Sequence, residues 1–198
     1  MAAYDPATAL VVVDVQNDFA DPEGSLFVAG APAVVEAVNA EVGWASEGDA
    51  PALVVYTQDW HPRHTPHFQV DGGVWPVHCV AGTWGAELHP GLSVVAGSEM
   101  VRKGVGGEDG YSAFSVRDPT TGEVSPTGLA AVLERRGVAR VVVVGLATDY
   151  CVRETALDAT RLGLRTTVVR GAVAAVDLAP GDGGRALYEL AAAGVHLE

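Results

Sequence analysis

The chain has 198 residues, 48% hydrophobic and 19% charged, which predicts a folded protein with a substantial core rather than a disordered one. Its formal net charge of −13 disfavours nucleic acid and anionic membranes as partners and favours small molecules. The apolar stretch at residues 9–15 is too short to span a bilayer, and two cysteines are too few for a disulfide framework. We therefore expect a cytoplasmic protein; a homo-oligomer is compatible with the sequence.

Strands and helices are expected to alternate along the chain. Apolar and β-branched runs predict strands at Leu10–Val15, Leu53–Thr57, Glu99–Arg102, Val141–Val144 and Thr166–Val169. Helices are predicted at Ala31–Ala45, from Ser125 to about Gly137, at Cys151–Leu162 and at about Gly184–Ala193, where a short final strand can follow. This alternation predicts an α/β fold with one doubly wound, mostly parallel sheet and helices on both faces. We expect a single domain over residues 1–198, with an irregular loop insertion at about 59–97.

Two charged residues stand at predicted strand ends, where function gathers in sheets of this kind. Asp14 follows four apolar residues, and a carboxylate there is costly to bury without a partner or a function. Lys103 is the only lysine of the chain, and its compact ammonium can act as a point charge beside a thiolate or carboxylate. The alternatives are a turn-forming aspartate and an ordinary solvated lysine.

Cys151 is the candidate nucleophile because it stands where a strand is predicted to turn into a helix. Unpaired N–H groups at a helix start favour thiolate and can hold an oxyanion. The alternative is a small buried hydrophobe. We expect that structural role for Cys79, which lies beside a histidine with no helix start nearby.

Histidines concentrate in the loop insertion. Four of the six lie between positions 61 and 78, namely His61, His64, His67 and His78. Asp59 and His61 are two residues apart at the end of an extended run, so their side chains can share one face. Carboxylate with imidazole suits zinc, iron or manganese, and the alternative is a polar loop with surface histidines.

Aromatic residues flank these polar positions. Any one of them alone is expected to serve packing rather than ligand contact, but as a set they could wall a pocket for a flat ring. They are Phe19, Trp60, Phe68, Trp75, Tyr111 and Tyr150.

Several of these positions fall into motifs whose joint order is highly specific. The motifs are 14–19 (DVQNDF), 59–62 (DWHP), 75–83 (WPVHCVAGT), 103–104 (KG), 111–114 (YSAF) and 145–152 (GLATDYCV). Through them, nearly the whole chain resembles the nicotinamidase/pyrazinamidase group of the isochorismatase-like cysteine hydrolases.

The resemblance implies a catalytic triad of Asp14, Lys103 and Cys151. It also implies one divalent metal, zinc, iron or manganese, and we assign its ligands as follows: Asp59, His61, His67 and His78, with His64 as the alternative to His67. The implied oxyanion hole is the backbone of Ala147 and Cys151, beside a cis peptide at Leu146-Ala147. The implied substrate contacts are Phe19, Trp75, Tyr111 and Tyr150.

The resemblance further implies hydrolysis of nicotinamide to nicotinic acid and ammonia through a thioester on Cys151, with pyrazinamide also accepted. Carbamoylsarcosine-type amidases share the triad but not the metal site, so an amidase for carbamoyl or ureido compounds is the first alternative. The second is a metal-dependent binding protein with a redox-active Cys151, although binding alone does not require a proton shuttle such as Asp14 and Lys103.

Overall fold

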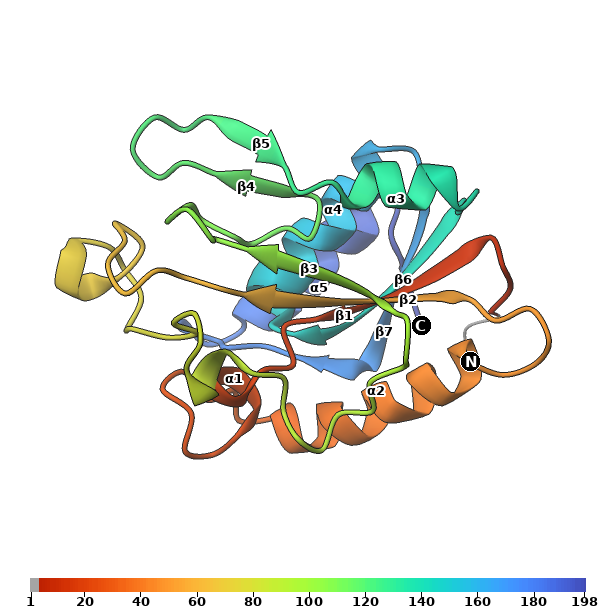
Figure 1. The fold of residues 1–198 in the computed structure, drawn as a ribbon, viewed down its shortest axis with the longest axis horizontal. Helices are drawn as coiled ribbons and strands as arrows, with labels where there is room; N and C mark the ends of the chain where they lie inside the picture. Colours follow the sequence, from red (N-terminus) through yellow and green to blue (C-terminus); the bar gives the residue numbers. More distant parts are fainter. Residues whose placement is uncertain (1–3) are drawn as a thin grey trace.

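Residues 4–198 are described by a computed structural model, in which six parallel strands form one sheet (Figure 1). The order is β3-β2-β1-β6-β7-β8, and every pairing between neighbours is parallel. The strands are β1 (Thr8–Val13), β2 (Leu53–Asp59), β3 (Glu99–Lys103), β6 (Arg140–Leu146), β7 (Arg165–Ala174) and β8 (His196–Leu197). The predicted doubly wound sheet is confirmed.

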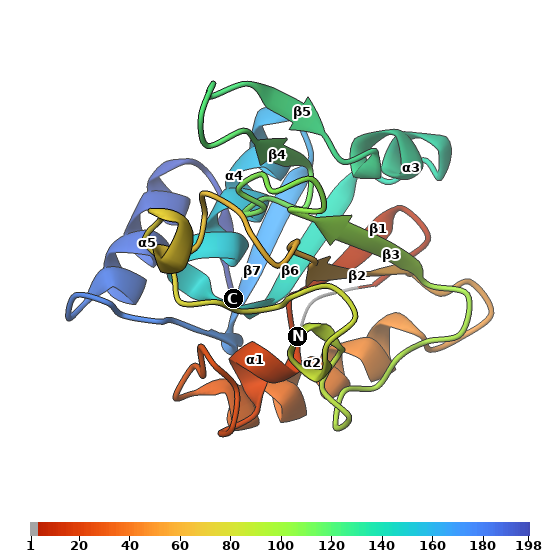
Figure 2. The ribbon, with the colours of Figure 1, turned by 60° about the vertical axis from the view of Figure 1, so that its left-hand side comes forward.

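Helices cover both faces of this sheet, as Figures 1 and 2 show. Helix α2 (Ala31–Ala45) packs on one face, where Leu10 and Val12 of β1 join its core. Helices α3 (Leu129–Arg135), α4 (Arg153–Arg161) and α5 (Asp182–Ala192) lie on the other face with Ala9 and Val11. Successive side chains of a strand point to opposite faces, so a run of apolar residues fills both cores. Within residues 4–198, no helix combines the length and apolar character needed to cross a membrane.

The helix expected from Ser125 to Gly137 begins later than predicted. Ser125 and Pro126 belong to strand β5 (Val124–Pro126), which pairs antiparallel with β4 (Ser115–Arg117) in a separate hairpin. The chain then turns at Gly128, whose φ of 94° suits glycine, before α3 starts. Cross-strand pairing in the hairpin therefore overrides the local capping signal of Ser125-Pro126.

Other elements differ from the prediction mainly at their ends. Strand β7 extends to Ala174 rather than ending at Val169, with a register irregularity between Val143 and Gly145 of its partner β6. Helix α4 starts at Arg153 because residues 148–152 form a π-helical turn that contains Cys151. Two 3₁₀ turns, Gln69–Asp71 and Trp84–Ala86, lie in the insertion predicted as irregular, and short helix α1 (Asn17–Ala20) lies where no element was predicted.

The order of the strands reverses at β1, which lies between β2 and β6. In open α/β sheets the crevice beyond the carboxyl ends of such strands is where ligands bind. Gly145 lets β6 approach β1 closely, because a Cβ on this residue would come 2.1 Å from Val13 O. Its φ of 109° also favours glycine. Asp14, directly after β1, has a φ of 47° and turns away from the strand direction. The sheet thus places Asp14 and the turn after β6 side by side.

Candidate active site

A fully buried ammonium group organises the crevice. Lys103 is the last residue of β3, and its Nζ lies 2.6 Å from Asp14 Oδ2 and 2.5 Å from Asp59 Oδ1. The same Nζ donates to Gly110 O at 2.5 Å and lies 3.8 Å from Cys151 Sγ. One cation therefore contacts two carboxylates and a thiol, and these four groups come from four separate parts of the chain.

The two carboxyl groups have pKa values shifted in opposite directions. Burial, together with the negative charge of Asp59, raises the pKa of Asp14 to about 6, although Lys103 opposes the shift. Burial alone would raise the pKa of Asp59 as well, but the Lys103 charge and His61 outweigh it and lower that pKa below its ordinary value. Asp59 is thus held as a carboxylate, while Asp14 can exchange a proton near neutral pH.

Cys151 is held as a thiol, which differs from the expectation that a helix start favours thiolate. Burial raises its pKa well above the ordinary value, against the lowering effect of Lys103. The side chain is 7% exposed and lies inside the π-helical turn rather than at its first residue. A hydrogen bond with Asp14 favours the protonated sulfur further. Since the nucleophile carries its proton at rest, its attack needs a base within reach.

The turn that carries Cys151 begins at a cis peptide bond between Leu146 and Ala147, which confirms the expectation drawn from the resemblance. The carbonyl oxygen of Ala147 accepts hydrogen bonds from the N–H groups of Tyr150 and Val152, both at 3.1 Å. Ala147 and Cys151 both line the pocket at the end of β6. The backbone expected to hold an oxyanion therefore lies beside this pocket.

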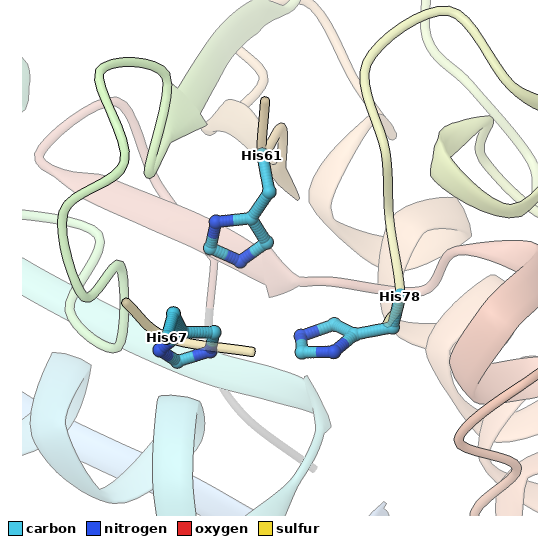
Figure 3. Close-up of side chains that lie close together, drawn as sticks. All are labelled: His61, His67 and His78. Carbon is cyan, nitrogen blue, oxygen red and sulfur yellow. The ribbon is translucent and has the colours of Figure 1, made fainter. Parts of the chain in front are cut away.

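Three histidines of the loop insertion meet beside this group (Figure 3). One ring nitrogen from each of His61, His67 and His78 lies within 4.8 Å of the other two, and all three residues are buried. His64, the alternative ligand, lies apart from them: its side chain is 83% exposed and pairs with Asp71.

The donor set in this cluster fits a divalent metal. Both ring nitrogens of His61 are buried without a hydrogen-bond partner, although buried polar atoms usually have one. Asp59 Oδ2 lies 3.8 Å from His61 Nε2 and 4.0 Å from His78 Nε2, while its Oδ1 binds Lys103. Three imidazoles and a carboxylate are ligands for zinc, iron or manganese. Asp59 joins this cluster to the ammonium group of Lys103.

Aromatic side chains wall the pocket above the thiol. Trp75 Nε1 donates to Tyr111 Oη at 2.8 Å, and Tyr150 contacts both rings. Of the six aromatic candidates, the structure brings four to the pocket: Phe19, Trp75, Tyr111 and Tyr150. Phe68 is buried against the histidines, and Trp60 stacks with Arg102 instead.

Several residues that support the site were not predicted from the sequence. Gln16 holds the backbone of Asp59 from both sides, since its Oε1 accepts the Asp59 N–H and its Nε2 donates to Asp59 O, each at 2.8 Å. Thr57 donates to Asp14 Oδ1 at 2.6 Å. Asp18 accepts the N–H of Cys79 at 2.6 Å, and Asp149 accepts those of residues 176 and 177. Gln16, Asp18 and Asp149 lie inside the quoted motifs, and this position in a motif is the sequence signal that could have identified them.

The fold and a buried thiol, carboxylate and ammonium together define a hydrolase with an α/β architecture. A model of the isochorismatase domain matches residues 8–195, and the chain belongs to this family. It is 40% identical to the nicotinamidase of Acinetobacter baylyi, over 94% of this chain and 90% of that protein.

Solved structures agree with this assignment. The crystal structure of PnC1 from L. infantum in complex with nicotinate has a TM-score of 0.88 and 38% identity, over 100% of this chain and 95% of that chain. The pyrazinamidase of Pyrococcus horikoshii in complex with zinc has a TM-score of 0.85 and 36% identity, over 98% and 99%. The resemblance found in the motifs is thereby confirmed.

Proposed function

We propose that this chain is a nicotinamidase that hydrolyses nicotinamide to nicotinic acid and ammonia and also accepts pyrazinamide. The observation that carries the proposal is the position of Lys103, whose Nζ contacts Asp14 and Asp59 and lies 3.8 Å from Cys151 Sγ. This contact puts the acid/base, the nucleophile and a candidate metal ligand around one cation. Relatives that are named nicotinamidase and align with most of this chain support the choice of substrate.

The first chemical step is proton transfer followed by attack. Asp14, with a pKa of about 6, is largely ionised at neutral pH and takes the proton of Cys151, while Lys103 stabilises the thiolate that results. The sulfur then forms a bond to the carboxamide carbon of a ring held between Phe19 and Trp75. Backbone N–H groups of Ala147 and Cys151 receive the resulting oxyanion, and losing one such donor typically costs about 10²–10³ in rate.

The second half of the reaction returns the enzyme to its starting state. Asp14 gives its proton to the departing amine, the C–N bond breaks and ammonia leaves, so that an acyl thioester remains on Cys151. Asp14 then takes a proton from water as the water oxygen attacks the thioester. Cleavage of the C–S bond releases nicotinic acid, and the sulfur recovers its proton.

The buried donors beside the triad serve a resident divalent metal in this proposal. Its ligands are Asp59, His61, His67 and His78, with the metal being zinc, iron or manganese. When bound, the metal supplies a Lewis-acidic position for the ring nitrogen of the substrate and so orients the carboxamide. Residues 1–198 form one domain in this scheme, with the metal-binding loop at about 59–97.

Ammonia release from nicotinamide by the purified protein tests the proposal. The assay is run before and after chelation and after metal is restored, with metal content determined on the same samples. We expect release that falls with the metal and returns with it. Release that is unaffected in a metal-free sample would favour a carbamoyl- or ureido-type amidase. Tight nicotinamide binding without turnover of any amide would favour a binding protein instead.

A further inference from the structure

Among the described residues, two aspartate–histidine pairs of the loop insertion lie within hydrogen-bond distance, and they differ sharply in burial. His64 Nδ1 lies 3.2 Å from Asp71 Oδ1, with the histidine side chain 83% exposed. His67 Nδ1 lies 2.6 Å from Asp109 Oδ1, with the histidine side chain 4% exposed. The first pair is at the surface, whereas the second reaches the histidine cluster from a different loop. The two contacts are chemically alike, but only the Asp109–His67 contact involves a histidine of the cluster.

The three clustered histidines are oriented in three different ways. His78 Nδ1 lies 2.7 Å from the backbone oxygen of Pro76, so its own loop holds the ring. His61 has no hydrogen-bond partner and is held by packing. Gly104 lies so close to its ring that a Cβ on this glycine would come 2.5 Å from His61 Cε1. Among the described residues of the cluster, His67 is the histidine oriented by an ionisable side chain, that of Asp109.

The geometry points to Asp109 as a positioning residue for the metal site, an inference that rests on the proposed metal-binding function. An ionised carboxylate only accepts hydrogen bonds, so His67 carries its hydrogen on Nδ1 and keeps the lone pair of Nε2 available to a metal. A carboxylate in this position fixes both the tautomer and the ring plane of a ligand histidine and raises its basicity. Nothing in the proposed reaction itself requires Asp109, because its carboxylate contacts the far side of the ring.

Asp109 is itself held firmly enough to play this part. Its N–H donates to Arg117 O at 2.7 Å and its carbonyl oxygen accepts the Arg117 N–H at 3.0 Å, an antiparallel bridge to strand β4. A second link joins the two loops, since Thr65 Oγ1 donates to Gly107 O at 2.7 Å. The glycine-rich loop after β3 is therefore anchored on both sides of the Asp109–His67 contact. The hairpin β4–β5, which lies outside the main sheet, supports the metal site through this loop.

Metal affinity measures the role of Asp109 without any turnover. The metal-free protein is titrated with zinc in competition with a chromophoric chelator, as the wild type and as the variants Asp109→Ala and Asp71→Asn. We expect Asp109→Ala to weaken zinc binding roughly 10- to 100-fold. Asp71→Asn, which alters the exposed aspartate–histidine pair, should bind zinc as the wild type does.

A spectroscopic measurement separates orientation of the ligand from a general loss of structure. Cobalt is substituted for zinc, and its visible absorption reports the coordination of the ion. We expect the spectrum to change in Asp109→Ala and to match the wild type in Asp71→Asn. Should the alanine variant not fold, Asp109→Ser replaces it, because serine keeps a polar side chain at this partly exposed position but lacks the carboxylate that contacts His67. Either variant keeps the backbone bridge to Arg117.

The variant His78→Ala distinguishes failure of this inference from failure of the metal site. Loss of zinc in His78→Ala, with wild-type affinity and an unchanged cobalt spectrum in the Asp109 variants, would overturn the role of Asp109 and leave the metal site standing. Wild-type affinity in His78→Ala as well would remove the metal site itself. Weakened binding in the Asp109 and His78 variants together, but not in Asp71→Asn, supports both.

Discussion

The triad of Asp14, Lys103 and Cys151 lies at the ends of sheet strands, whereas the histidine cluster lies on a loop. The triad groups are fixed by the parallel register of β1, β3 and β6. The histidines depend on contacts between loops, such as that of His67 with Asp109. Asp59, the last residue of β2, belongs to both regions. The difference predicts that changes in the triad affect chemistry, while changes in the cluster affect metal and substrate binding.

The largest effect should come from Cys151→Ala, because the proposed reaction has no nucleophile without the sulfur. We expect turnover of nicotinamide to fall by at least about 10⁴-fold, as for other catalytic nucleophiles. Metal content and the unfolding transition should stay close to the wild type, since the proposed ligand set does not include the thiol. Ammonia release and metal analysis on one sample check both expectations. Near-normal activity in the variant contradicts the covalent scheme.

Lys103→Met should damage stability as well as turnover. It leaves Asp14 and Asp59 buried next to each other without their shared cation. Removing one partner of a buried ion pair typically costs about 3–5 kcal/mol in the free energy of unfolding. Denaturant unfolding measures this loss. A loss below about 1 kcal/mol, which is the size expected of an exposed ion pair, would contradict the buried contact of Lys103 with the two carboxylates. Lys103→Arg is the control for charge alone, and we expect it to be inactive because a planar guanidinium cannot replace the compact ammonium.

His78→Ala should act on the cluster while sparing the triad. We expect at least about 10-fold weaker metal binding, because even the loss of a group supporting a ligand costs that much. The KM for nicotinamide should rise as the metal content falls. His64→Ala is the matched control, since its side chain is 83% exposed and lies outside the cluster. Equal metal content in the two variants would remove His78 from the ligand set.

The smallest effect should be a shift of the pH profile in Thr57→Val. Asp14 must be ionised to take the thiol proton, so kcat/KM should fall as the pH drops below its pKa of about 6. The hydroxyl of Thr57 donates to Asp14 and lowers this pKa, so its loss should raise the pKa and move the acid limb to higher pH. Thr57→Ser keeps the hydroxyl and should keep the limb in place. A limb that moves to lower pH would reverse the assigned role.

The strand pattern predicted most of the fold, and the motifs identified most of the candidate residues. Apolar β-branched runs are buried on both faces of a parallel sheet, so their positions could be read directly from the chain. Helix Ala31–Ala45 was predicted with the bounds that the structure has. The start of α3 was wrong because Ser125 and Pro126 pair across a hairpin, and such a nonlocal contact leaves no trace in local capping preferences.

The sequence by itself determined the parallel α/β sheet, the candidate thiol, carboxylate and ammonium, and the concentration of histidines in one loop. Only the tertiary structure decided that His67 rather than His64 lies with His61 and His78. It also decided that Cys151 is held as a thiol and that Asp109 contacts His67 across 42 residues of chain. Spacing along a chain predicts which face a side chain takes within one strand or helix. Burial and contacts between loops depend on every element around them, and these set the protonation of the sulfur and the choice of histidine.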